Sequence, residues 1–501
     1  MRAGEGGLAK PSPFSSATLR HVMDRDAEEL ARFGYAQELL RRLGGFSAFA
    51  IGFSVISVLT GITSTFGDAL GAGGPAGLGV GWPLVSAGTM LVAVAMAELA
   101  SAFPTAGALY HWSALLGGRG WGWLTAMLNL TGQIAIVAAI DLACAQAMAQ
   151  MLGLSPVAAY PLLAAILFVH GALNATSVRL VAWLNDASAT VHIVGVVALA
   201  ALLLAHRVHP LGYLAETGAT TRTDHSYALG FLQALVLGVW TFTGFDAAAH
   251  VSEETHDPQR RAPFGIVSSV AVSAVAGFAF VAALTLALRD LPAIAGKPDA
   301  ALLVLSGALG EGPARFALGL AVLAMWFAGL ASVTSASRML FAFARDEGLP
   351  MARALRSVSP RTRTPLNAIA ACVVVPGLLV AATAPLSETV FLAVAALATI
   401  ALYASYSVPI ALGMVARARK RWTRMGPFSM GRAGPAVALA SLVWTAVVFL
   451  VCFLANAMAM GFFSAVVLFL AALWVLSVKA RFKGPKVDLS HFEGVVRNAA
   501  E

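Results

Sequence analysis

Apolar stretches of about 20 residues recur along most of this chain, and no other feature restricts its fold as strongly. The 12 stretches cover residues 46–67, 82–103, 122–151, 157–173, 180–205, 229–251, 264–287, 314–342, 366–383, 389–414, 435–456 and 459–478. Each is long enough to cross a bilayer as a helix, which satisfies its own backbone hydrogen bonds. The sequence therefore predicts an all-α integral membrane protein with 12 transmembrane helices.

The composition argues against other classes of protein. Hydrophobic residues make up 59% of the chain and charged residues 12%, a charged share about half that of soluble domains. The net charge of +8 is spread in short basic runs between apolar stretches, so no nucleic-acid partner is indicated. The 3 cysteines lie inside apolar stretches without metal-ligand spacing, which indicates neither a disulfide framework nor a zinc site.

The basic residues predict the topology. An even number of spans places both termini on one side of the membrane. With the leader, residues 1–45, in the cytoplasm, 28 Lys and Arg residues lie on that side and 5 on the other. This asymmetry follows the positive-inside rule. We therefore expect a multi-pass protein of the plasma (inner) membrane with a cytoplasmic leader and a cytoplasmic tail, residues 479–501.

Two of the stretches are interrupted near their middle by small polar residues and glycine. These are Ser54, Ser57, Thr60 and Gly61 in the first stretch, and Thr241, Thr243, Gly244 and Asp246 in the sixth. A helix that breaks inside hydrocarbon leaves backbone groups unpaired, which is costly unless they line a cavity. Two breaks in corresponding positions are typical of secondary transporters, with one binding site near the bilayer midplane.

Three motifs at the ends of predicted spans resemble a known family. They are MAELASAFPTAGALYHW at 96–112, GFDAAAHVSEETHDPQRRAP at 244–263 and SRMLFAFARDEGLP at 337–350. Together they resemble the amino acid/choline transporter branch of the amino acid–polyamine–organocation superfamily, whose members carry amino acids, 4-aminobutyrate, choline or polyamines. The resemblance covers roughly residues 40–480.

The resemblance implies a transporter core built from five-plus-five inverted repeats with discontinuous helices 1 and 6. The repeats would be residues 46–205 and 229–414, followed by two accessory helices at 435–478. Substrate would cross by alternating access.

The resemblance also places the substrate on the two breaks. The N-terminus of a half-helix offers free N–H groups and a positive dipole end to a carboxylate. The expected contacts are Ser57, Thr60, Gly61, Thr241 and Gly244, with Trp240 and Phe245 beside them to exclude water. The alternative is that the small residues only allow close helix packing. Many relatives carry a Gly-Ser-Gly type break where this chain has Leu59-Thr60-Gly61, which leaves open which backbone groups are free.

Two aspartates lie within the predicted spans, where a charge calls for a partner or a function. Asp246 follows the second break and could contact a substrate ammonium; the resemblance favours a role in organising the unwound segment. Asp141, in the middle of the third span, could face the cavity and bind a cationic group or pair with a hydroxyl or amide in the bundle. Both are candidate substrate-binding residues.

His192, in the fifth span, is the candidate for proton coupling. Alignment of Leu184-Asn185 with a Val-Asn pair of proton-coupled relatives places His192 where they carry a lysine. A histidine can gain and lose a proton near neutral pH. The alternative is a buried neutral imidazole without a coupling role.

Opposite charges end several predicted spans on the cytoplasmic side. They are Glu98, Glu253, Glu254, Arg338 and Arg345. We expect them to form a gate that closes while the substrate site opens outward; the alternative is ordinary interfacial anchoring.

The predicted function is therefore a proton-coupled permease for an amino acid or 4-aminobutyrate, with choline or polyamine uptake, or amino acid exchange, as alternatives. An enzyme is not indicated, because HExxH, GxSxG and compact catalytic clusters are missing from the sequence. No cofactor is implied. A sensor would keep the same pocket but is expected to need a longer signalling tail, and a channel fits the two breaks less well than alternating access does.

Overall fold

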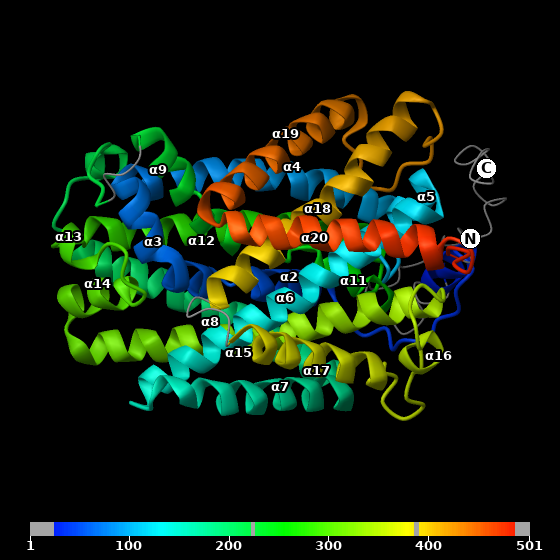
Figure 1. Cartoon of the computed structure of the whole chain (residues 1–501), viewed down its shortest axis with the longest axis horizontal. Coiled ribbons are helices and arrows are strands. Elements are labelled where there is room, and N and C mark those ends of the chain that lie inside the picture. The colour runs from blue at the N-terminus through cyan, green and yellow to red at the C-terminus, as the bar shows by residue number, and fades with distance from the viewer. Residues whose placement is uncertain (1–24, 222–225, 385–389, 486–501) are drawn as a thin grey trace, which may run out of the picture.

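The computed structural model describes residues 25–221, 226–384 and 390–485, and these residues form helices and no strand. The main helices are α2 (Gly45–Ile56), α3 (Val58–Gly79), α4 (Gly81–Ala102), α5 (Leu109–Gly117), α6 (Arg119–Met151), α7 (Ala159–Thr176), α8 (Val178–Ala205), α9 (Tyr227–Ala234), α10 (Val236–Thr241), α11 (Ala247–His250), α12 (Pro258–Leu286), α13 (Leu291–Ile294), α14 (Ala300–Leu309), α15 (Glu311–Arg345), α16 (Ala352–Leu355), α17 (Leu366–Thr383), α18 (Val390–Ala418), α19 (Gly434–Ala455) and α20 (Ala457–Leu473). The long helices run roughly along one direction and form a single elongated bundle (Figure 1). The all-α prediction is confirmed.

Eleven helical segments among the described residues are long and apolar enough to cross a membrane. Each overlaps one of the predicted spans. The remaining predicted span, 229–251, is divided among α9, α10 and α11, and its apolar helix, Tyr227–Thr241, is shorter than the others. The count of 12 crossings is therefore not confirmed. The cause is the interruption itself, which shortens the helix that the apolar stretch predicts.

Both predicted helix interruptions are present. The first span continues as α3 to Gly79 but breaks between α2 and α3 at Ser57. The second break separates α10 from α11 over residues 242–246. α6 packs against both α15 and α18, and α12 packs against α2 and α4. These long helices hold the two breaks inside the protein.

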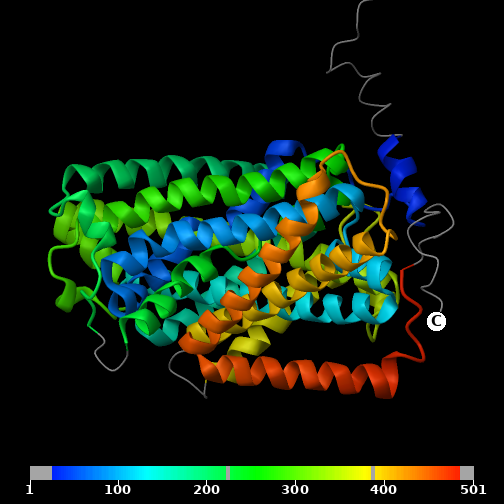
Figure 2. The ribbon, with the colours of Figure 1, turned by 90° about the horizontal axis from the view of Figure 1, so that it is seen from above.

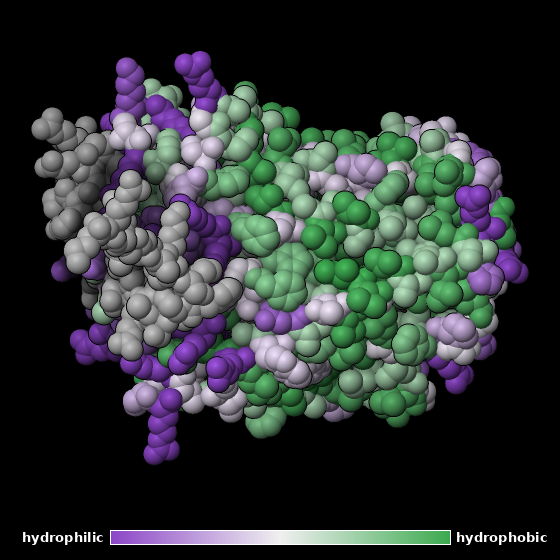
Figure 3. Space-filling view, turned by 180° about the vertical axis from the view of Figure 1, so that it is seen from behind, coloured by the Kyte–Doolittle hydropathy of each residue, from purple (hydrophilic) through white to green (hydrophobic). Residues whose placement is uncertain are grey.

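The outer helices turn apolar side chains outward. Phe168 of α7, Trp183 of α8 and Leu468 of α20 are each more than half exposed. α20 runs along one edge of the bundle (Figure 2), and a broad apolar band separates two hydrophilic ends (Figure 3). Such a band is expected of a surface that faces lipid.

Residues 25–43 lie against one end of the bundle, and we call them the N-terminal strap. Its apolar side chains Leu30, Phe33, Leu39 and Leu43 are buried in the main core. Leu43 also pairs with Thr255 through a short backbone bridge. The strap, residues 345–363 and residues 417–432 form what we call the arginine-rich end (Figure 1). The rest of the predicted leader, 1–24, and residues 486–501 of the predicted tail lie outside the described residues.

Candidate substrate site and gate

The first break is centred on one residue, Ser57. Ser57 adopts left-handed backbone angles, with φ 40° and ψ 78°. Its Oγ lies 2.5 Å from Oγ1 of Thr60. The first backbone bond of α3 runs from Gly61 N to Ser57 O, at 3.0 Å. The N–H groups of residues 58–60 therefore precede the intrahelical ladder and carry the positive end of the helix dipole.

His192 caps this helix end. Leu59 N donates to Nε2 of His192 over 3.0 Å, and the imidazole is buried. Because a backbone N–H can only donate, Nε2 is the unprotonated nitrogen of a neutral ring and the proton is on Nδ1. Within the described part of the chain, Nδ1 has no hydrogen-bond partner. The ring packs edge-on against Phe53 of α2, at 5.3 Å between centroids.

The second break is an unwound segment centred on Gly244. Gly244 has φ +83°, a conformation that glycine adopts without strain. Its N–H donates to the Tyr406 hydroxyl over 3.2 Å. A Cβ at this position would overlap Val55 of α2. The second break is thus fitted closely against the helix that precedes the first.

Asp246 ends the unwound segment and is completely buried. Its Oδ1 accepts from the Tyr406 hydroxyl at 2.7 Å. Its Oδ2 lies 3.0 Å from Asn129 Nδ2, 3.2 Å from Gln133 Nε2 and 3.2 Å from His250 Nε2. Partners from α6, α11 and α18 therefore converge on one carboxylate, an arrangement that fixes the course of the unwound chain.

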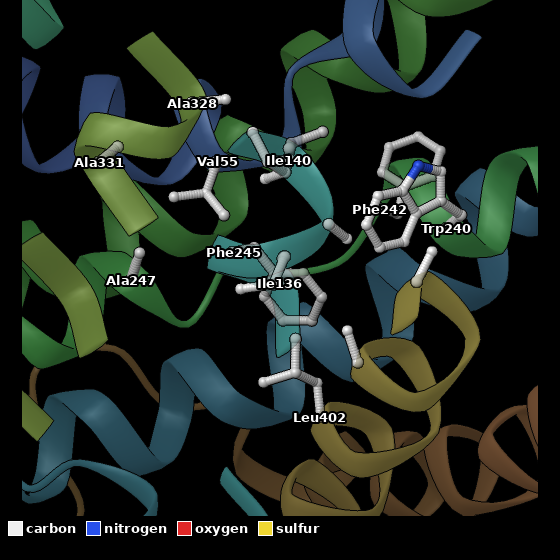
Figure 4. Packing of buried hydrophobic residues seen from close by; sticks show 14 of the residues in the cluster. Val55, Ile136, Ile140, Trp240, Phe242, Phe245, Ala247, Ala328, Ala331 and Leu402 are labelled. Atoms are coloured by element: carbon white, nitrogen blue, oxygen red, sulfur yellow. The ribbon is translucent and has the colours of Figure 1, made fainter. Parts of the chain in front are cut away.

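The two breaks touch through small residues. A Cβ at Gly61 would overlap the Thr241 side chain, so α3 and α10 approach closely here. Thr241 Oγ1 donates to Leu237 O at 2.6 Å. Phe245 lies against Ile136 of α6 (Figure 4) and is fully buried. The close approach of α3 and α10 therefore requires a residue without a Cβ at Gly61.

The larger cavities lie toward the end opposite the arginine-rich end. One, of about 440 Å³, is bounded by α3, α6, α14 and α15, with Thr63, Gln146 and Asp299 among its polar residues. A second, of about 140 Å³, is lined by Trp240 and Asp68. Trp240, a predicted substrate contact, therefore lines a cavity next to the second break.

Asp141 lies apart from both breaks. It is buried at the meeting of α6, α7 and α15, where its Oδ2 is 3.2 Å from Nδ1 of His170. Neither of the two roles that the sequence left open for Asp141 included an imidazole partner.

The predicted gate charges meet as two buried ion pairs at the arginine-rich end. Arg345 contacts both oxygens of Glu253, at 2.8 and 3.0 Å. Arg338 Nε donates to Glu254 at 2.9 Å. Glu98 does not join them: it pairs with Arg417 at 2.6 Å and accepts from the chain after α18.

The N-terminal strap adds to these pairs. The Arg345 guanidinium lies 3.8 Å from the centre of the Tyr35 ring. The Tyr35 hydroxyl donates to Asp346 over 2.7 Å. Burial, together with the Asp346 charge, raises the pKa of Tyr35 well above its usual value, so the phenol stays protonated. The strap is therefore joined to the helix end that carries the gate arginine.

Several polar residues of the site were not singled out from the sequence. These are Asn129, Gln133, His250 and Tyr406 around Asp246, His170 beside Asp141, and Tyr35 of the strap. A signal was available for some of them. Asn129 and Gln133 are four residues apart in an apolar span, and His250 is four residues after Asp246, so each pair shares a helix face.

Two interrupted helices that meet inside an apolar bundle, with cavities toward one end and ion pairs at the other, define a multi-pass membrane transporter. Comparison with known proteins identifies the family. The family model described as amino acid permease matches residues 43–481. The chain belongs to this family, which supports amino acid transport and not catalysis.

Named relatives extend over most of the chain. It is 34% identical to the amino-acid permease BAT1 of Arabidopsis thaliana, over 84% of this chain and 87% of that protein. It is 28% identical to the GABA-specific permease of Saccharomyces cerevisiae, over 85% of this chain and 76% of that protein. A solved Na+-coupled sialic acid symporter aligns with 86% of this chain and 96% of its own, at 17% identity and a TM-score of 0.48.

Proposed function

We propose that the protein is a proton-coupled permease for an amino acid or 4-aminobutyrate, working by alternating access in the plasma (inner) membrane. The observation that carries the proposal is the bond between Leu59 N and His192. It joins a helix end suited to a carboxylate to an imidazole, a group that can bind and release a proton. A relative named as a GABA-specific permease supports the choice of substrates.

The substrate carboxylate would bind the first turn of α3. Ser57, Thr60 and Gly61 would supply this side of the site. Thr241 and Gly244 would supply the other side, with Trp240 and Phe245 excluding water. In this proposal Asp246 shapes the break without touching substrate, because four donors already occupy its oxygens.

Protonation of His192 would link proton binding to substrate binding. A proton on Nε2 removes the acceptor of Leu59 N and places a positive charge beside the positive end of α3. Both effects release the helix end and favour an anion there. A substrate carboxylate bound to α3 would in turn stabilise the imidazolium, since such coupling is reciprocal. One proton would therefore travel with one carboxylate.

The positive-inside rule would place the arginine-rich end in the cytoplasm. Both termini would then be cytoplasmic. The Glu253–Arg345 and Glu254–Arg338 pairs would close this end while the cavity of about 440 Å³ opens outward. The pairs would have to part before substrate is released inward.

Uptake into proteoliposomes tests the proposal. The purified protein is reconstituted and given an inward proton gradient without sodium, with 4-aminobutyrate, neutral and basic amino acids, choline and putrescine as substrates. We expect gradient-driven accumulation of an amino acid or 4-aminobutyrate. Accumulation of choline or putrescine alone would overturn the choice of substrate, and no uptake of any compound would overturn transport by this mechanism.

Two variants test His192. His192→Gln keeps an acceptor for Leu59 N but cannot titrate, so it should retain exchange at equal pH and lose accumulation driven by the gradient. His192→Ala also removes the acceptor and should lower both. If His192→Ala accumulates substrate as well as the unaltered protein does, the coupling proposal is wrong.

A further inference from the structure

Asp141 and His170 form a buried pair that the proposed function does not use. Both side chains are fully buried, on α6 and α7. The carboxylate is the acceptor at 3.2 Å, so Nδ1 of His170 carries a proton and donates to Oδ2. Oδ1 of Asp141 and Nε2 of His170 have no hydrogen-bond partner among the described residues. A buried imidazole nitrogen and a buried carboxylate oxygen are thus both able to take a proton.

The neighbouring helix leaves room for the pair. A Cβ at Gly329 of α15 would overlap Oδ1 of Asp141 and lie 2.7 Å from Cε1 of His170. One turn earlier on α15, Trp326 packs edge-on against the imidazole, with 5.0 Å between centroids. The glycine therefore permits a charged pair where any larger residue would displace it.

A chain of hydrogen bonds leads from the backbone oxygen of His170 to Arg338 and Glu254. Asn174 Nδ2 donates to the backbone oxygen of His170 at 3.1 Å. Its Oδ1 accepts from Thr334 at 2.8 Å and from Arg338 Nη1 at 3.3 Å. The same guanidinium bonds Glu254 through Nε. His170 is therefore four residues before Asn174, the residue whose side chain accepts a hydrogen bond from Arg338.

The larger cavity is lined by residues of α6 and α15, the helices that carry Asp141 and Gly329. Its lining includes Ala143, two residues after Asp141, and Met325, four residues before Gly329. Four residues are about 6 Å along a helix. The pair therefore lies within about one helical turn, along α6 and α15, of residues that line the cavity.

We propose that Asp141 and His170 form a second proton-binding site, distinct from His192, which takes a proton from the larger cavity and transmits its charge to the Arg338–Glu254 pair. One proton binds Nε2 of His170; no other bond forms, and the same proton leaves on release. Binding converts a pair with net charge −1 into a neutral imidazolium–carboxylate pair. Burial favours the neutral form, so proton loss requires water or a new donor at the site.

The surroundings supply few competing charges. The titratable or charged groups in the middle of these helices are Cys144 of α6, Cys372 of α17 and Arg338 of α15. Others lie toward the helix ends: Arg119 of α6, Tyr160 of α7, and Glu311, Arg315 and Arg345 of α15. Cys144 Sγ is directed to Val322 O at 3.6 Å. The two members of the pair are therefore each other's nearest countercharge.

Trp326 provides a direct readout that needs no transport. An imidazolium quenches an indole that it contacts, so Trp326 fluorescence should fall as pH is lowered in the purified full-length protein. Subtracting the signal of Trp326→Phe isolates this indole from the other tryptophans. Trp183→Phe, at a mostly exposed position on α8, is the matched control, and its difference signal should not titrate.

Variants of the pair decide the outcome. His170→Gln should abolish the titration of Trp326. Asp141→Asn removes the countercharge of the imidazolium and should weaken or abolish the response of Trp326 to pH. A titration that persists in His170→Gln, or no pH-dependent difference for Trp326 between pH 4.5 and 8.5, would overturn the proposal.

A transport measurement tests whether the Asp141–His170 pair contributes to proton coupling. This role rests on the proposed function. Asp141→Asn and His170→Gln should keep amino acid exchange at equal pH and take up about half as many protons per substrate under a gradient, because the proton carried by His192 remains. Unchanged proton uptake in both would overturn coupling through this pair. Failure of the proposed function looks different, because the unaltered protein would then accumulate no amino acid while Trp326 still titrates.

Discussion

At the break between α2 and α3 the backbone departs from the helix at Ser57, whereas between α10 and α11 it unwinds over residues 242–246. The first break is capped by one imidazole nitrogen, on His192. At the second, four donors surround Asp246. A single acceptor that can be protonated is easily withdrawn, and a carboxylate with four donors is not.

The difference assigns unlike roles to the two breaks. The second break is held in one conformation, because moving it would leave several buried donors unpaired at once. The first can respond to a proton, because only one backbone bond depends on the cap. Variants at Asp246, Gly244 and Ser57 should therefore differ in severity in that order.

The largest effect is expected at Asp246. Asp246→Ala leaves the donors of Asn129, Gln133, His250 and Tyr406 without their shared acceptor, and should lower the free energy of unfolding by more than about 3 kcal/mol and abolish uptake. Tyr406→Phe removes one of these donors and should cost about 1–2 kcal/mol. Thermal unfolding in detergent, with uptake in liposomes, measures both. Equal stability of the two variants would contradict a cluster centred on the carboxylate.

A smaller effect is expected at Gly244. Gly244→Ala adds a positive-φ penalty of about 1–2 kcal/mol and an overlap with Val55 of about 1–3 kcal/mol. Gly310→Ala is the matched control, because Gly310 has φ +86° but open space around its Cβ position. The unfolding temperature should fall further for Gly244→Ala than for Gly310→Ala. Adding Val55→Ala should recover part of the difference; no recovery would show that the breaks are not in contact.

The sequence predicted the positions of the two breaks better than the side-chain contacts around them. Small polar residues and glycine inside an apolar stretch mark a helix that cannot continue, and this signal is local. Hydropathy and this signal together identified the helices and both interruptions. Hydropathy also predicted 12 crossings, because it counts the sixth stretch as one helix although the unwound segment divides that stretch.

The partners of the buried charges could not be predicted in the same way. Asp246 meets Asn129, and Asp141 meets His170, only because separate helices pack against each other. Glu98 likewise pairs with Arg417, far along the chain, instead of with the other gate residues. Hydropathy gives the position of a polar residue in its span but not the face that a neighbouring helix will cover.

The smallest effect is expected at Ser57. Ser57→Gly relieves the strain of a left-handed backbone conformation by about 1–2 kcal/mol. The same change removes the contact with Thr60 and raises the entropy of the unfolded chain, and each of these costs about 1 kcal/mol of stability. The terms nearly cancel, so its unfolding temperature and uptake should stay close to those of the unaltered protein. Ser57→Val has the same backbone strain with a branched side chain and should lose uptake. If Ser57→Gly is as impaired as Ser57→Val, the hydroxyl itself is needed and the site depends on more than the backbone of the break. Normal uptake by Ser57→Gly would leave the first turn of α3, with its cap from His192, as the group that the substrate carboxylate meets.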